Sequence, residues 1–410
     1  MTRTLSAWTA ILALVVATPD VRADEWPMPH SLAEAIQMEK ATALPLTPFY
    51  NPPSMQGTQP GDLLHKAVFS RYKLPKGVRA VRILYHSRDA HGKDVATSGV
   101  VLIPAGKRPA KGWPVIAWAH GTTGVARVCA PSLDKNLSYG EEGLFPMVRA
   151  GFAVIATDYH GLGTPGPHQY LNKVAQANDV IYSVPAAHQA VAGLDARWVA
   201  VGHSQGGFAV WGVDELEADR GDKTFLGAIA VAAGGNPGDW LAAISTAGPE
   251  AAMYLPYVAF ALHAVSPTFT PETLLSGTAL KLYPTVTTQG CFNYAYGATV
   301  DNKSAESSVR SSGWQNDPAV VAFTTANALG QAHIAQPLLL IAGDADQTVP
   351  YPVVVASVKT ACQAKLPIHF STYKGLDHDP TMDQSTPEQL AWVRARYAGE
   401  PATSNCPKDP

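Results

Sequence analysis

Six short, largely apolar runs recur along the chain and alternate with longer stretches of mixed polarity. Runs of five to seven residues with few charges are typical of strands buried on both faces of a parallel sheet. They lie at 114–119, 152–157, 198–202, 228–233, 337–343 and 368–373. Two earlier strands are expected at 80–87 and 97–103, on either side of a turn signal in the sequence RDAHGKD.

Helix-like stretches separate these runs, so strand and helix alternate along most of the chain. The clearest ones lie at 173–194, 207–219, 350–363 and 386–398. Such alternation predicts an α/β fold with an open, mostly parallel, doubly wound sheet. The residues before the first strand, 24–75, are rich in proline and loop-forming residues and are interpreted as an N-terminal wrap.

The alternation stops between residues 235 and 330. Aromatic residues are scattered there among proline, glycine and serine, and no strand-helix repeat continues. We interpret this stretch as a cap inserted over the carboxyl ends of the strands. A separate domain is the weaker alternative, because the run at 337–343 resumes the sheet pattern. The core is thus expected in two parts, 24–234 and 331–410, with the cap at 235–330 between them.

The first 23 residues have the pattern of a signal peptide. Arg3 precedes an apolar run at 5–17, which is shorter than the roughly 18 residues that a membrane span needs. Small residues in VRA, at 21–23, predict cleavage before Asp24, and a membrane anchor is the weaker interpretation. We therefore expect an exported protein, either extracellular or periplasmic, with no transmembrane segment after the signal is removed.

Composition narrows the classes of partner. The 410 residues carry a formal net charge of −3, so the chain has no basic field for nucleic acid. Four cysteines in an exported chain predict two disulfides, and three pairings are possible. A metal site is less expected, because the sequence contains neither a Cys-x-x-Cys pair nor a His-Glu-x-x-His motif.

The pentapeptide GHSQG, at 202–206, carries the strongest chemical signal. It follows an expected strand and precedes an expected helix, which is the setting of a nucleophile elbow. In such a turn the serine backbone is strained, and side chains two residues before and after it would collide. Gly202 and Gly206 meet that steric demand. Ser204 is therefore the candidate nucleophile, and an idle serine in a glycine-rich turn is the weaker alternative.

A serine alcohol needs a base to take its proton and a carboxylate to orient that base. Among the histidines after Ser204, His378 is the candidate because it lies in an expected loop after the last strand. For the acid, both Asp344 and Asp346 follow the strand at 337–343. Asp346 is preferred by its place at the start of DQTVP.

The oxyanion that forms on attack needs two fixed N–H donors. One is expected to be the amide of Gln205, which directly follows the nucleophile. The other is expected in the loop AWAHGTTG, at 117–124, with the amide of Thr122 as first choice and that of Gly121 as second. His120 is interpreted as a residue that orders this loop.

Several longer motifs together resemble the secretory lipases, an α/β-hydrolase family that includes the lipase A type of yeasts and related exported bacterial lipases. The motifs are AHGTTGVARVCAPS, DYHGLGTPGPHQYL, GHSQGG, GDADQTVP and GLDHDPT. The resemblance implies the triad Ser204, Asp346 and His378, no cofactor, and a helical cap that binds the acyl group. It also implies the disulfides Cys129–Cys291 and Cys362–Cys406.

The sequence thus predicts a secreted serine ester hydrolase, a lipase or carboxylesterase that cleaves lipid-like esters such as triacylglycerols. Its expected partners are a small-molecule or lipid ester and a lipid–water interface. One alternative is an esterase for short-chain or aromatic esters, or an acyltransferase or peptidase of the same fold. Another is a hydrolase-like protein that binds a ligand without catalysis. An aromatic-rich cap argues for an apolar acyl group rather than a charged peptide.

Overall fold

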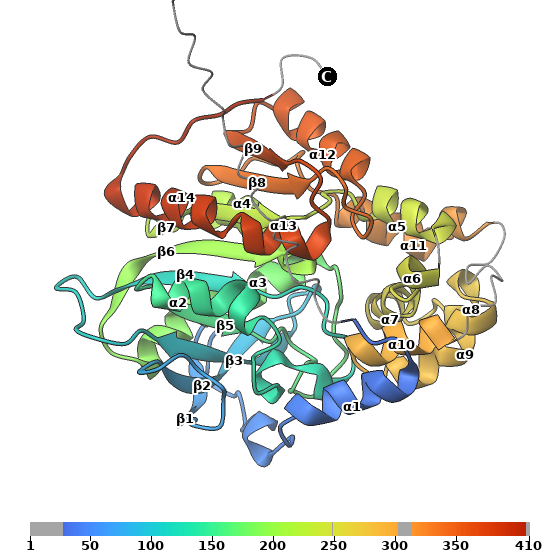
Figure 1. Ribbon diagram of the computed structural model, residues 1–410, viewed down its shortest axis with the longest axis horizontal. Helices are drawn as coiled ribbons and strands as arrows, with labels where there is room; N and C mark the ends of the chain where they lie inside the picture. Colours follow the sequence, from blue (N-terminus) through green and yellow to red (C-terminus); the bar gives the residue numbers. More distant parts are fainter. Residues whose placement is uncertain (1–27, 248, 302–312, 407–410) are drawn as a thin grey trace, which may run out of the picture.

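The computed structural model describes residues 28–247, 249–301 and 313–406, and the expected signal peptide at 1–23 lies outside them. Nine strands of the described part form one sheet in the order β1-β2-β3-β5-β4-β6-β7-β8-β9 (Figure 1). They are β1 (Leu63–Val68), β2 (Arg79–Arg88), β3 (Asp94–Ile103), β4 (Trp113–Ala119), β5 (Ala153–Thr157), β6 (Leu194–His203), β7 (Phe225–Val231), β8 (Leu338–Gly343) and β9 (Ile368–Tyr373).

The sheet is mixed but mostly parallel. The strands from β5 through β4 to β9 pair in parallel, whereas β1, β2, β3 and β5 form antiparallel pairs at one edge. At the centre, Gly202 of β6 pairs with Ala119 of β4 and Ala230 of β7. Because parallel strands end on the same side, the loops after β4 and β6 start next to each other.

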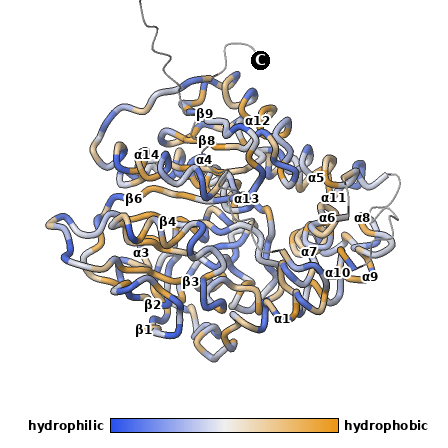
Figure 2. The backbone as a smooth tube through the Cα atoms, in the orientation of Figure 1, coloured by the Kyte–Doolittle hydropathy of each residue, from blue (hydrophilic) through white to orange (hydrophobic). Residues whose placement is uncertain are grey.

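Helices cover both faces of the sheet, as the alternation predicts. In Figure 1, α2, α13 and α14 lie in front of the strands, and α3 and α4 lie behind them. Along β6, Trp198 and Ala200 join the core under α3 and α4, whereas Val199 and Val201 join the core under α2 and α14. Figure 2 shows the central strands as largely hydrophobic. The helices are α2 (Phe145–Arg149), α3 (Lys173–Ala190), α4 (Gln205–Arg220), α12 (Tyr351–Gln363), α13 (His378–Gln384) and α14 (Thr386–Ala398).

The described residues between β7 and β8 are mostly helical and lie beside the sheet, at the right of Figure 1. Several of its helices start at a proline in the first turn, a position that needs no backbone N–H. The helices are α5 (Pro237–Thr246), α6 (Pro249–Ala252), α7 (Leu255–Val265), α8 (Pro271–Leu274), α9 (Gly277–Val286), α10 (Phe292–Asp301) and α11 (Pro318–Ala326). They occupy the stretch where the sequence predicts a cap.

The stretch 24–75, interpreted as an N-terminal wrap, contains a helix and a strand that its sequence pattern did not predict. Helix α1 (Leu32–Thr42) has Ser31 as its N-cap, whose hydroxyl accepts a hydrogen bond from the amide of Glu34, and it packs against α10. Strand β1 pairs with β2 at the sheet edge, where none of its residues is fully buried, so its apolar pattern is weak. No helix of the described residues is long and apolar enough to cross a membrane.

Candidate active site

Ser204 lies on the tight turn between β6 and α4, in a strained backbone conformation. Its φ of 56° and ψ of −120° are unusual for a residue with a side chain. The turn is held at both ends, because the Ser204 amide donates to the carbonyl of Val231 at 2.8 Å and the Ser204 carbonyl accepts from the amide of Phe208 at 3.0 Å. The local structure is that of a nucleophile elbow.

Close backbone contacts explain the two glycines of the elbow. A Cβ on Gly202 would overlap the carbonyl of Gly206, and a Cβ on Gly206 would overlap the carbonyl of Ala119 at the end of β4. Both obstacles are backbone atoms, which cannot rotate away. The elbow is therefore pressed against the start of the loop after β4.

His378 and Asp346 meet in a short hydrogen bond. Nδ1 of His378 donates to Oδ2 of Asp346 at 2.8 Å, and both side chains are buried. The other carboxylate oxygen of Asp346 accepts from the amides of Thr348 and Val349 at 2.9 and 2.8 Å. Asp346 therefore holds the imidazole with Nδ1 protonated, which leaves Nε2 as the nitrogen that can take a proton.

The structure bears on two details of the sequence interpretation: the alternative acid Asp344 and the loop position expected for His378. Asp344 accepts a hydrogen bond from the amide of Gly375 and so orders the loop between β9 and α13. His378 was expected in a loop, but it is the first residue of α13, with Asp377 as its N-cap. The helix was missed because it is only seven residues long and contains a proline.

Burial alone lowers the pKa of His378, but nearby carboxylates more than offset this effect. The charge of Asp346 and its hydrogen bond raise the pKa, with smaller contributions from Asp379 and Asp377, to about 9. The imidazole of His378 is therefore expected to be largely protonated at neutral pH in the free protein.

His203, the residue before Ser204, links His378 to the loop after β4. Its Nε2 donates to the carbonyl of His378 at 3.3 Å, and its Nδ1 accepts from the hydroxyl of Tyr139 at 3.2 Å. The Tyr139 hydroxyl also accepts a hydrogen bond from the amide of Gly121. Neither residue was predicted from the sequence. His203 occupies a variable position of the G-x-S-x-G motif, and Tyr139 lies outside every motif.

The expected oxyanion donors lie at the junction of β4, β6 and α4. Gln205 is the first residue of α4, so its amide has no partner within the helix. Because the amide of Gly121 already donates to the Tyr139 hydroxyl, the amide of Thr122 is the better of the two candidate donors in the loop. His120 is buried and contacts the carbonyls of Gly121 and Asp158, consistent with an ordering role. Burial lowers the pKa of His120 to about 4.

His203, His378 and Asp379 also lie close enough together to suggest a metal site, since their ligand atoms fall within 4.8 Å of one another. Both nitrogens of His203 and Nδ1 of His378 are already hydrogen-bonded within the protein. The His203 proton on Nε2 would have to leave before a metal could bind. The cluster therefore fits acid–base chemistry better than metal binding.

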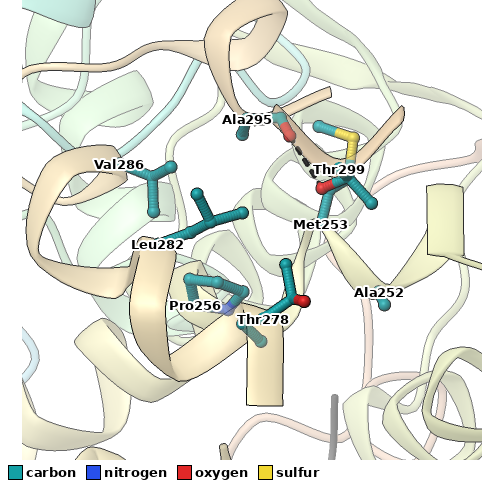
Figure 3. Close-up of a pocket in the computed structure, with 9 residues that line it drawn as sticks. Ala252, Met253, Pro256, Thr278, Leu282, Val286, Ala295 and Thr299 are labelled. Atoms are coloured by element: carbon teal, nitrogen blue, oxygen red, sulfur yellow. Dashed lines mark hydrogen bonds between the residues drawn. The ribbon is translucent and has the colours of Figure 1, made fainter. Parts of the chain in front are cut away.

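Ser204 lines a hollow between the core and the helical segment that follows β7. Its lining is mostly apolar and aromatic and comes from α4, from α5 and from the loops before α3 and α12. The lining residues are Tyr170, Leu171, Ser204, Gln205, Phe208, Gly234, Pro237, Trp240, Tyr254, Thr348 and Val349. A second, smaller pocket lies within the cap itself, between α7, α9 and α10, and its labelled lining includes Met253, Leu282 and Val286 (Figure 3).

Two disulfides occur in the described residues, with the pairings that the family resemblance implies. Cys129 bonds Cys291 and joins the loop after β4 to the start of α10 in the cap. Next to this bridge, the amide of Phe292 donates to the carbonyl of Thr123 at 3.0 Å. Cys362 bonds Cys406 and fixes the C-terminal segment to α12.

Comparison with known proteins agrees with this geometry. The family model described as secretory lipase matches residues 139–405, which is more than half of the chain. No curated protein sequence matches. Among solved structures, Candida antarctica lipase A in its closed state has a TM-score of 0.70 at 18% identity, covering 88% of this chain and 89% of that one.

Two bacterial structures are similar to the same extent. A rice cell wall degrading esterase from Xanthomonas oryzae has a TM-score of 0.68 at 18% identity, over 83% of this chain and 99% of that one. A putative hydrolase from Legionella pneumophila gives the same four values. At such low identities the solved structures show only a shared α/β-hydrolase fold. Family membership is shown by the match to the family model. The chain therefore belongs to the secretory lipase family and is an ester hydrolase of the lipase and esterase type.

Proposed function

We propose that this protein is an exported serine hydrolase that cleaves lipid-like carboxylic esters, triacylglycerols among them. Ser204 attacks the ester carbonyl while Nε2 of His378 takes its proton, and Asp346 stabilises the imidazolium. The amides of Thr122 and Gln205 hold the oxyanion. His378 then protonates the leaving alcohol, and water hydrolyses the acyl-enzyme by the same steps.

One set of contacts carries this proposal. His378 is hydrogen-bonded to Asp346, and its carbonyl accepts a hydrogen bond from His203, the residue before the strained Ser204. Ser204 lines an apolar hollow. The lining of that hollow favours an uncharged acyl group. Pro237, Trp240 and Tyr254 of the segment 235–330 contribute to this lining, which supports assigning that segment to acyl binding.

The test is a series of p-nitrophenyl esters from acetate to palmitate, together with emulsified triglyceride, on the mature protein. Hydrolysis of long chains and emulsion supports a lipase. The Ser204→Ala variant is expected to lose about a millionfold in kcat, because the triad acts as a unit. Ser245→Ala, which removes a hydroxyl from the exposed side of α5, is the matched control. Full activity in Ser204→Ala would contradict the proposal.

Aromatic side chains around Ser204 favour a second candidate, an esterase for aromatic acids. Tyr170, Phe208, Trp240 and Tyr254 all line the hollow, and planar acyl groups stack on such rings. Higher kcat/KM on methyl cinnamate and its ring-hydroxylated analogues than on p-nitrophenyl decanoate would select this candidate.

Export is proposed from the signal-like segment 1–23 and is supported by the two disulfides, which form in oxidising compartments. Mass spectrometry of the protein recovered outside the cytoplasm should find Asp24 as its first residue. A mature chain that retains 1–23 would contradict cleavage.

A further inference from the structure

The segment DYHGLGTPGPHQYL, at 158–171, runs from the end of β5 past the proposed oxyanion hole, and none of its residues takes part in the proposed mechanism. Two buried carboxylates fix its start. Asp158 accepts hydrogen bonds from the Ser98 hydroxyl and from the amide and hydroxyl of Ser132. The amide and Nδ1 of His160 both donate to Asp179 at 2.9 Å.

The end of this segment contacts the first proposed donor residue. The hydroxyl of Tyr170 is hydrogen-bonded to the hydroxyl of Thr122 at 2.8 Å, and Tyr170 is only 2% exposed. Because burial raises the pKa of Tyr170 to well above neutrality, the phenol keeps its proton. The bond therefore ties the side chain of Thr122 to a rigid, buried ring.

Two residues earlier, His168 contacts the second proposed donor residue. Nδ1 of His168 faces the carbonyl of His160 at 3.0 Å, and a carbonyl can only accept, so this nitrogen carries the proton. Burial lowers the pKa of His168 to about 3 and keeps the ring neutral. Nε2 is therefore an acceptor, and the side-chain amide of Gln205 donates to it at 3.1 Å.

We propose that residues 158–171 fix the geometry of the oxyanion hole. Tyr170 is the positioning residue for Thr122, and His168 is the positioning residue for Gln205. This inference rests on the proposed function, because it takes the amides of Thr122 and Gln205 as the donors. An oxyanion donor must lie about 2.7–3.1 Å from a charge that exists only in the transition state. Holding each donor residue by its own side chain limits movement of its amide when the substrate binds.

The first test uses Tyr170→Phe, which removes one hydroxyl and keeps the ring that lines the hollow. On p-nitrophenyl butyrate we expect kcat to fall about tenfold, which is less than the hundredfold or greater loss of a donor itself. KM should stay within about twofold, since the ground-state carbonyl depends less on the donors. The inhibition constant of butylboronic acid, which forms a tetrahedral adduct on Ser204, should rise in parallel with the loss in kcat.

The second test separates the two bonds of His168. His168→Asn can keep the donor to the carbonyl of His160 but cannot reach Gln205, so kcat should fall about tenfold. His168→Gln can place its amide oxygen near the position of Nε2, so it should restore most of the loss. Rescue by this variant is a result that simple loss of packing would not give.

A double-mutant cycle tests whether Tyr170 acts through Thr122. Thr122→Val deletes the same hydrogen bond from the other side, so Tyr170→Phe with Thr122→Val should be no slower than either single variant. Tyr397→Phe is the matched control, because it also removes a hydroxyl that donates to backbone carbonyls, those of Val115 and Arg197, outside the proposed site. If Tyr170→Phe does not fold, as judged by thermal melting, Thr122→Val alone carries the test.

Unchanged kcat and boronate affinity in Tyr170→Phe and His168→Asn would overturn the proposal. So would a change in KM with kcat unaltered, or an equal fall in kcat in Tyr397→Phe. Failure of the proposed function looks different, because the wild-type protein would then hydrolyse no ester, or Ser204→Ala would remain active.

Discussion

The pH dependence of hydrolysis follows from the charges around His378. The carboxylates of Asp346, Asp379 and Asp377 outweigh burial and raise the pKa of His378 to about 9. Only the neutral imidazole can take the serine proton, and at pH 7 that form is about one hundredth of the total for a pKa of 9. We therefore expect kcat/KM to rise about tenfold per pH unit from 6 to 8 and to level off above 9.

The assay is kcat/KM for p-nitrophenyl butyrate between pH 5 and 10.5, corrected for spontaneous hydrolysis. Asp379→Asn removes a charge that favours the imidazolium, so the inflection should move to lower pH and activity at pH 7 should increase relative to the plateau. Asp317→Asn, at the N-cap of α11, is a control carboxylate that leaves the inflection in place. A wild-type inflection at or below the ordinary value for histidine, near 6.5, would refute this reasoning.

Three further predictions concern the acid, the elbow and the cap. Asp346→Asn should lower kcat about ten-thousandfold by favouring the wrong tautomer of His378, whereas Asp344→Asn should change kcat less than tenfold; equal effects in steady-state assays would contradict the assignment. Gly206→Ala should destabilise the fold by about 3 kcal/mol or more in guanidinium unfolding, because its Cβ meets the carbonyl of Ala119. Gly238→Ala in α5 meets no atom closer than 3.2 Å and should be tolerated much better. Replacing Cys129 and Cys291 by alanine should lower the free energy of unfolding by about 2–5 kcal/mol. That loss should exceed the loss for Cys362 and Cys406, since the first bridge spans 162 residues and the second 44.

Much of the core could be predicted from sequence because its strands are buried on both faces. Strand β8 has an apolar residue or glycine at every position, and the structure begins and ends it within one residue of the predicted run. Strand β1 was missed for the opposite reason: as an edge strand it exposes His65 and Lys66, and its pattern resembles a loop. Helix α1 is stabilised by contacts with α10, more than 250 residues away, which no local pattern records.

The site shows the same division between local and distant signals. The elbow turn at Ser204 could be predicted because its steric rule acts within five residues. Asp346 and Asp344 are two residues apart in one loop, and motif position was the only guide between them before the hydrogen bond to His378 was seen. His203, Tyr139, His168 and Tyr170 bond to distant parts of the chain, and single histidines and tyrosines carry no spacing that would reveal such partners.

Labelling with a fluorophosphonate tests the central claim most directly. The reagent phosphonylates a serine only when a base activates it and an oxyanion site holds the phosphoryl oxygen. Incubation of the mature protein followed by peptide mass spectrometry should find one adduct, on Ser204, formed in step with the loss of ester hydrolysis. Hydrolysis that survives complete labelling of Ser204, or an adduct on another serine that abolishes it, would contradict the account.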